Sequence, residues 1–95
     1  MREPDDVELM LAFKQGDYNA FALLVERHQL GLIQFFYAQG GDRALAEDCT
    51  QEVWRKIFRA REDYTHRAQF KTYLLRVARN LWIDVFRSKS RTSGD

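Results

Sequence analysis

Apolar residues recur along this chain at the three- and four-residue spacing of an α-helix, from near its start almost to its end. No stretch alternates apolar and polar residues over the length that a β-strand needs. The pattern therefore predicts an all-α fold, a compact bundle of about four helices without a sheet. A chain of 95 residues has the size of one small domain, and domains this short bury only about 60% of the surface that their unfolded forms expose.

Capping residues divide the predicted helices. An aspartate that can cap a helix N-terminus stands before each of the first three: Asp5, Asp17 and Asp42. Glycines that can end a helix follow the first two: Gly16, and Gly40 with Gly41. We therefore expect three helices within residues 5–60, an ordered loop over 61–69, a fourth helix over 70–88 and a frayed tail over 89–95.

Each of the three longer helices has an apolar stripe that predicts its buried face. In the second helix the stripe consists of Phe21, Leu24, Val25, His28, Leu32, Phe35 and Phe36. In the third it consists of Leu45, Cys49, Val53, Ile57 and Ala60. In the fourth it consists of Phe70, Leu74, Val77, Ala78, Leu81 and Val85. Packed together, these stripes would form a single core.

The formal net charge of +1 conceals a strong asymmetry along the chain. Residues 1–54 carry four basic and ten acidic side chains, a net charge of −6. Residues 55–95 carry eleven basic and four acidic side chains, a net charge of +7. The C-terminal part therefore favours polyanionic partners, and the N-terminal part does not.

The fourth predicted helix has a second apolar face, opposite its core stripe. Large apolar side chains alternate there with arginines: Leu75, Arg76, Arg79, Trp82, Ile83, Phe86 and Arg87. Another helix can cover such a face, and so can single-stranded nucleic acid, because aromatic rings stack on bases at ~1–3 kcal/mol each and arginines neutralise phosphates. The preceding loop adds residues suited to a pocket for an unstacked base: Tyr64, Thr65, His66 and Gln69.

Other classes of function find little support in the sequence. Cys49 is the only cysteine, so no intrachain disulfide can form, and we expect a cytoplasmic location. The acidic N-terminus does not resemble a secretory signal, and no apolar run approaches the ~20 residues of a membrane span. One cysteine and two distant histidines offer no metal-ligand spacing, and His28 lies on an apolar stripe. We expect no enzyme, cofactor, metal, small-molecule substrate or membrane partner.

Three segments, in order along the chain, resemble region 2 of the extracytoplasmic-function (ECF) group of the sigma-70 family. Residues 70–80, FKTYLLRVARN, followed by Asp84, resemble the family pattern F-R-T-W-L-Y-R-I-A-R-N-x-x-x-D. Residues 46–54, AEDCTQEVW, are similar to A-E-D-x-x-Q-E-x-F, and residues 16–25 fit the opening G-D-x-x-A-F-x-x-L-V. The resemblance implies a helical domain that binds RNA polymerase and recognises and melts the promoter −10 element.

The resemblance also assigns residues to two surfaces. The face that docks on the coiled-coil clamp helices of the polymerase β′ subunit consists of Asp48, Gln51, Glu52 and Arg55. From spacing alone this face is an ordinary solvated helix surface. The residues implied in capturing the non-template strand of the −10 element are Tyr64, Thr65, His66, Arg67, Gln69, Phe70, Lys71, Thr72, Tyr73, Arg76, Arg79 and Asn80. An anti-sigma factor that covers these surfaces is a further implied partner.

The sequence departs from the family pattern in places that matter for specificity. Tyr73 stands where the family usually has tryptophan, and residues 64–68 lack the common wording F-R-G-x-S. The preferred −10 sequence can therefore not be carried over. The family normally continues into a second helical domain, region 4, which this sequence does not contain. The alternative function is a helical protein-binding adaptor, which salt sensitivity and competition by single-stranded DNA would distinguish from a strand-binding domain.

Overall fold

The computed structural model describes residues 2–65 and 68–93, and for 89–93 it describes the backbone alone. Within these residues four α-helices and one short 3₁₀-helix follow in the order α1 (Asp6–Lys14), α2 (Tyr18–Ala38), α3 (Arg43–Arg59), η1 (Arg61–Asp63) and α4 (Phe70–Ser93). The described residues contain no strand. The prediction of an all-α bundle is confirmed.

The three predicted aspartate caps form as expected. The Asp5 carboxylate accepts a hydrogen bond from the Glu8 backbone N–H at 2.8 Å, and Asp17 and Asp42 do the same for the amides of Ala20 and Leu45. Each cap satisfies a backbone donor that the helix leaves without a partner.

Glycines make the turns that follow α1 and α2. Gly16 and Gly40 have φ values of +106° and +108°, in the left-handed region that side chains with a Cβ rarely adopt. Gly41 serves a different purpose: a Cβ there would lie 3.2 Å from the Phe36 carbonyl oxygen and 3.6 Å from the Trp82 ring. The absence of a Cβ at Gly41 lets the turn between α2 and α3 approach α4 closely.

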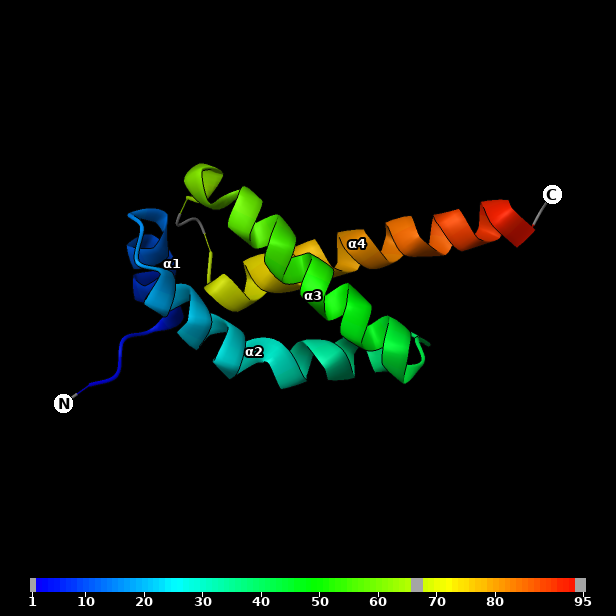
Figure 1. Ribbon diagram of the computed structural model, residues 1–95, viewed down its shortest axis with the longest axis horizontal. Helices are drawn as coiled ribbons and strands as arrows, with labels where there is room; N and C mark the ends of the chain where they lie inside the picture. Colours follow the sequence, from blue (N-terminus) through cyan, green and yellow to red (C-terminus); the bar gives the residue numbers. More distant parts are fainter. Residues whose placement is uncertain (1, 66–67, 94–95) are drawn as a thin grey trace.

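The helices form an elongated bundle of 54 × 24 × 21 Å (Figure 1). α3 crosses over α4 and packs on both α2 and α4, while α1 lies against the first turns of α2, beside η1 and the start of α4. The C-terminal turns of α4 run past the ends of the other helices (Figure 1). None of the helices in the described part of the chain has the length and hydropathy to cross a membrane.

The predicted stripes meet in one core that all four helices share. Its fully buried side chains include Phe13 of α1, Leu24 and Phe36 of α2, Val53 and Ile57 of α3, and Phe70 of α4. Every residue of the three predicted stripes is buried or half-buried. Trp82, on the second apolar face of α4, also packs inside the molecule, with its ring 6.1 Å from that of Phe36. For this residue, intramolecular packing explains the apolar side chain.

Two predicted boundaries change. α4 does not end at Ser88 but continues to Ser93, and the fraying of the tail stays a prediction. No proline or glycine interrupts the chain between Ser88 and Ser93, and Gly94 is the first residue that strongly disfavours a helix. Residues 94 and 95 lie outside the described residues. The predicted loop over 61–69 begins with one turn of 3₁₀-helix, η1.

Candidate nucleic-acid and protein interfaces

A pocket of about 300 Å³ lies between the predicted loop and the first turns of α4. Ala60, Asp63, Tyr64, Thr65, Ala68, Thr72, Tyr73 and Arg76 line it. Five of these were predicted as strand-binding residues: Tyr64, Thr65, Thr72, Tyr73 and Arg76. The volume is at the lower end of the range in which proteins bind small aromatic ligands. The fold therefore brings loop and helix residues together in a cavity, which we call the loop pocket.

Two tyrosines form the aromatic wall of the loop pocket. The ring of Tyr64 is buried and meets the ring of Tyr73 edge-on, with centroids 5.2 Å apart and an interplanar angle of 73°. Burial is the main cause that raises the pKa of each hydroxyl above its usual value. Both groups therefore stay neutral at physiological pH and can donate hydrogen bonds. The buried Tyr64 hydroxyl has no hydrogen-bond partner within the described part of the chain.

A cationic side chain, that of Arg76, lies beside this aromatic wall. The Arg76 guanidinium lies 5.7 Å from the centroid of the half-buried Tyr73 ring, within the range of a cation–π contact. A base stacked near Tyr73 would therefore meet both an aromatic ring and a positive charge.

A second pocket of about 410 Å³ continues the first along the junction of α3 and α4. Both pockets share Ala60 and Tyr73, so the Tyr73 side chain lies where they meet. The second pocket is lined by Lys56 and Arg59 of α3 and by Val77, Asn80, Leu81 and Asp84 of α4. Together the two pockets form a groove, here called the α3/α4 groove, with basic side chains on both of its helices.

The predicted protein-binding residues lie on the outer surface of α3. Arg55 donates to Glu52 at 3.0 Å and to Gln51 at 3.4 Å, and Arg59 approaches the other Glu52 oxygen at 3.9 Å. Asp48 is exposed one turn earlier. A small polar pocket of about 210 Å³ extends this surface to α2 through Gln29 and Ile33. The four predicted residues therefore share one surface, which is rich in charge but largely self-paired.

Comparison with known proteins identifies the family. A family model described as Sigma-70 region 2 matches residues 24–92. The chain belongs to the sigma-70 family. Several of its curated relatives are ECF RNA polymerase sigma factors, which supports the resemblance to that group.

Three relatives illustrate the extent of the similarity. The chain is 34% identical to the ECF RNA polymerase sigma factor SigW of Bacillus subtilis (strain 168) over 80% of its own length and 41% of the relative. It is 30% identical to the ECF RNA polymerase sigma factor BldN of Streptomyces coelicolor over 86% and 31%, and 35% identical to the RNA polymerase sigma-H factor of Pseudomonas aeruginosa over 84% and 42%. The chain spans less than half the length of these relatives.

Four more predicted strand-binding residues of this sigma domain line neither pocket: Gln69, Phe70, Lys71 and Arg79. Gln69, Lys71 and Arg79 are exposed outside both pockets. Phe70 is only 1% exposed and faces the core, where its ring lies 6.0 Å from that of Tyr73. His66 and Arg67 lie outside the described residues.

Sequence reasoning missed several residues of the groove. Lys56 and Arg59 belong to the basic last turn of α3, a signal that favours a role at the helix C-terminus as much as a role in binding. Asp63 and Ala68 carried no signal beyond their place in the loop. Gln29 and Ile33 extend the α3 surface from another helix, and helical spacing within α3 alone could not reveal them.

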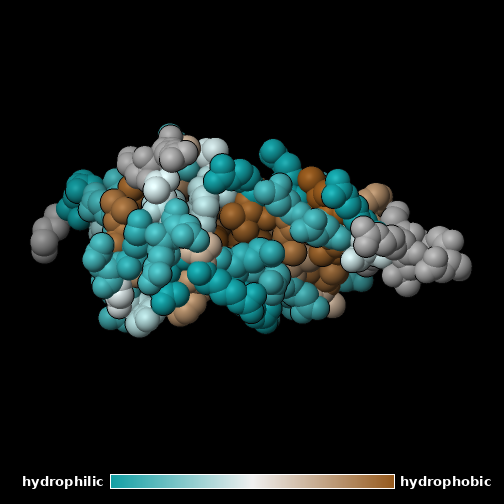
Figure 2. Space-filling view, turned by 90° about the horizontal axis from the view of Figure 1, so that it is seen from above, coloured by the Kyte–Doolittle hydropathy of each residue, from teal (hydrophilic) through white to brown (hydrophobic). Residues whose placement is uncertain are grey.

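The second apolar face of α4 is only partly covered. Ile83 is 40% exposed and Phe86 is 63% exposed, in contrast to Trp82. Figure 2, which views the molecule from the top of Figure 1, shows apolar surface emerging in the middle of a mainly hydrophilic face and again near the C-terminal end of α4. Ile83 and Phe86 are therefore accessible to an external partner.

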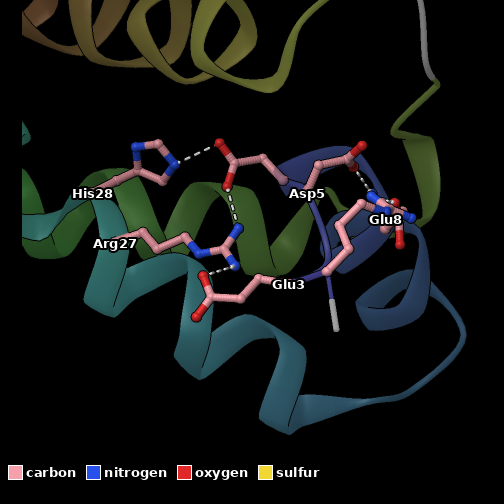
Figure 3. Close-up of polar contacts among 7 residues, drawn as sticks. Glu3, Asp5, Glu8, Arg27 and His28 are labelled. Atoms are coloured by element: carbon pink, nitrogen blue, oxygen red, sulfur yellow. Dashed lines mark hydrogen bonds and ion pairs between the residues drawn. The ribbon is translucent and has the colours of Figure 1, made fainter.

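His28 belongs to an ion-pair cluster and to the edge of the core. Its Nε2 lies 2.9 Å from an Asp6 carboxylate oxygen, and Arg27 donates to the other oxygen at 3.1 Å (Figure 3). The prediction of a satisfied boundary histidine is confirmed. Among the described residues, no three histidine, cysteine or acidic side chains are grouped so that they could hold a metal ion.

Proposed function

We propose that this sigma domain captures the non-template strand of the −10 element during transcription initiation, on behalf of cytoplasmic RNA polymerase. The observation that carries the proposal is the loop pocket: a cavity with an aromatic wall and an arginine beside it. A flipped base that stacks on the half-buried Tyr73 ring can bond through its edge to the polar groups of the lining.

The pocket offers different groups to the face of a base and to its hydrogen-bonding edge. The half-buried ring of Tyr73 provides a stacking surface, and Arg76 adds positive charge above it. Asp63, Thr65 and Thr72 provide acceptors and donors for the base edge. Phe70 contributes from the core side, where it holds the first turn of α4 in place.

The α3/α4 groove provides a path for the strand beyond the flipped base. Asn80 stands in the second pocket, where its amide can bond to a neighbouring base. Lys56 across the groove, and the exposed Lys71 and Arg79, supply charge for the phosphates. We propose that His66, Arg67 and Gln69 also contribute to strand binding.

The outer surface of α3 is the proposed docking site for the β′ clamp helices. Asp48, Gln51, Glu52 and Arg55 form it, and Gln29 and Ile33 extend it onto α2. Their largely self-paired charges can exchange partners with a polar helical surface at a small net electrostatic cost. An anti-sigma factor that competes for either surface is part of the same proposal.

Fluorescence anisotropy of the 95-residue chain with short labelled single strands, whose −10-like cores vary, tests the proposed strand capture. We expect sequence-selective binding that weakens as salt rises, with a logarithmic slope of about −0.7 per neutralised phosphate. Asn80→Ala should weaken binding, whereas Arg43→Ala, a charge loss at the opposite end of α3, should not. Equal affinity for every strand, or equal affinity of both variants, would contradict the proposal.

A helical protein-binding module is the second candidate, and the exposed Ile83 and Phe86 favour it. In that case the arginines of α4 form the polar rim of a protein interface. A protein partner that binds α4 and is not displaced by any single strand would favour this candidate over strand capture.

A further inference from the structure

The C-terminal end of α1 is bonded to the wall of the loop pocket. The Lys14 ammonium group donates a hydrogen bond to the backbone carbonyl of Tyr64 at 2.7 Å, across 50 residues of sequence. The bond is partly buried, and a charged donor makes it stronger than a neutral bond of the same length. Lys14 lies before the residues that the Sigma-70 region 2 model matches, so the family motif does not include this contact.

Few other backbone hydrogen bonds hold the described residues of the loop. Within the described residues, the Tyr64 N–H reaches the Arg61 carbonyl at a long 3.4 Å, and the next backbone bonds are those that Thr72 and Tyr73 donate to Gln69. Thr65 and Ala68 are the described residues between Tyr64 and Gln69, and no backbone hydrogen bond joins them to each other. A side chain that fixes the Tyr64 backbone therefore has a large share in setting the position of the pocket wall.

α1 is itself a firm support. The Phe13 ring is fully buried and stacks on the Phe21 ring of α2 at 4.5 Å. Next to it, Arg61 of η1 lies 4.8 Å from the centroid of Phe58 and 6.0 Å from that of Phe13. At the other end of α1, Asp6 binds Arg27 and His28 of α2 (Figure 3). Lys14 therefore extends from a helix that is fixed at both ends.

We propose that Lys14 is a positioning residue of the loop pocket. Its bond to the Tyr64 backbone holds the Tyr64 ring and hydroxyl against Tyr73 in the geometry that receives the base. The inference rests on the proposed strand capture and adds to it a support outside the matched family region. Lys14 acts through Tyr64 and makes no contact with the strand. A loop that samples several positions pays an ordering cost on binding, and a fixed loop avoids it.

Lys14→Met, in the full 95-residue chain, tests the proposal against a phosphate-binding role for the same charge. We expect the variant to bind a −10-like single strand about three- to tenfold more weakly at every salt concentration, with an unchanged salt slope. Lys14→Arg, which keeps a charged donor, should restore most of the affinity. Arg43→Met is the matched control for the loss of one positive charge, and it should bind like the parent chain.

Hydrogen exchange measured by mass spectrometry provides a readout that does not depend on the strand. In Lys14→Met, peptides covering residues 61–69 should exchange faster, while peptides from the centres of α2 and α3 keep their protection. Unchanged exchange over 61–69 overturns the proposal, as does a uniform increase throughout the chain or a salt slope reduced by about 0.7. If the parent chain binds no strand at all, the proposed function fails, and the exchange of 61–69 still decides whether Lys14 holds the loop.

Discussion

The outer surface of α3 and the exposed surface of α4 are both rich in charge, but the charges are arranged differently. On α3, Arg55 and Arg59 lie beside Glu52, and Arg43 pairs with Glu47 at 3.1 Å. On α4, neither Arg79 nor Arg87 forms an ion pair with any described residue, and Arg76 lies over an aromatic ring instead. Two surfaces of similar charge density therefore differ in how much charge is left uncompensated.

This difference separates two kinds of partner. A surface whose ions already neutralise each other attracts a polyanion weakly, but it can exchange hydrogen bonds with a protein helix. A surface with uncompensated arginines concentrates phosphates and gains affinity by releasing counterions. The α3 surface thus suits the clamp helices and the α4 surface suits a nucleic-acid strand, so substitutions should affect one partner and spare the other.

The largest expected effect concerns the protein partner. Gln51→Ala combined with Glu52→Ala should weaken association with a β′ clamp fragment by about 2–5 kcal/mol, because it leaves Arg55 without its partners in a desolvated interface. Calorimetry with the isolated clamp helices measures the change. Strand binding by the same variant should be unaltered, and unchanged clamp affinity would remove the assignment of this surface.

The second effect concerns the strand. Asn80→Ala and Arg76→Ala should each weaken binding to a −10-like single strand by about 1–3 kcal/mol, and only Arg76→Ala should also reduce the salt slope. Clamp binding should be the same in both variants. If either variant loses clamp affinity and strand affinity together, the two surfaces are not separate and the comparison fails.

The third effect tests the hydroxyl in the pocket wall. Tyr64→Phe should raise the free energy of unfolding by about 1 kcal/mol, because it removes a buried hydroxyl that has no partner in the described structure. Strand affinity should change little, because the buried hydroxyl is not accessible to a ligand. Chemical denaturation measures the stability and fluorescence anisotropy measures the strand affinity. A loss of stability would show that the hydroxyl already has a partner, and a fall in strand affinity would show that it reaches the base.

The pH dependence of stability provides a check on the same group. Burial raises the pKa of the Tyr64 hydroxyl above 10.0, so the folded state retains the proton more tightly than the unfolded state. The associated stability is present below pH 10 and is lost as the pH rises through the folded-state value. Tyr64→Phe should therefore unfold less readily than the parent chain in alkaline solution, and equal alkaline midpoints would contradict this.

Much of the fold could be predicted because its signals are local. An aspartate before each of the first three helices and a glycine after the first two fixed the boundaries, since each acts within one helical turn. The core stripes followed from helical periodicity in the same way. The end of α4 was misjudged because serine and threonine at residues 88–93 are weak helix formers, yet nothing among them breaks the helix.

The site was less predictable because it depends on contacts between distant segments. Family motifs indicated Tyr73, Arg76 and Asn80, but no pattern shows that the ring of Tyr64 is buried as the pocket wall. Lys14 had no local signal at all, because its partner is the backbone carbonyl of a residue 50 positions away. Spacing along a helix identifies a face, whereas the depth of a pocket depends on which loop packs over that face.

The smallest expected effect tests the pairing on α3 directly. Arg55→Ala should lower the free energy of unfolding by only about 0.2–0.5 kcal/mol, because its partner Glu52 is one helical turn away at a partly exposed site. Raising the salt should reduce even this difference, which denaturation at two ionic strengths measures. Its strand affinity should match that of the parent chain, because the lost positive charge was already neutralised by Glu52. A fall in strand affinity comparable to that of Arg76→Ala would mean that the outer surface of α3 contributes uncompensated charge to the strand, and the contrast between the two surfaces would then have to be abandoned.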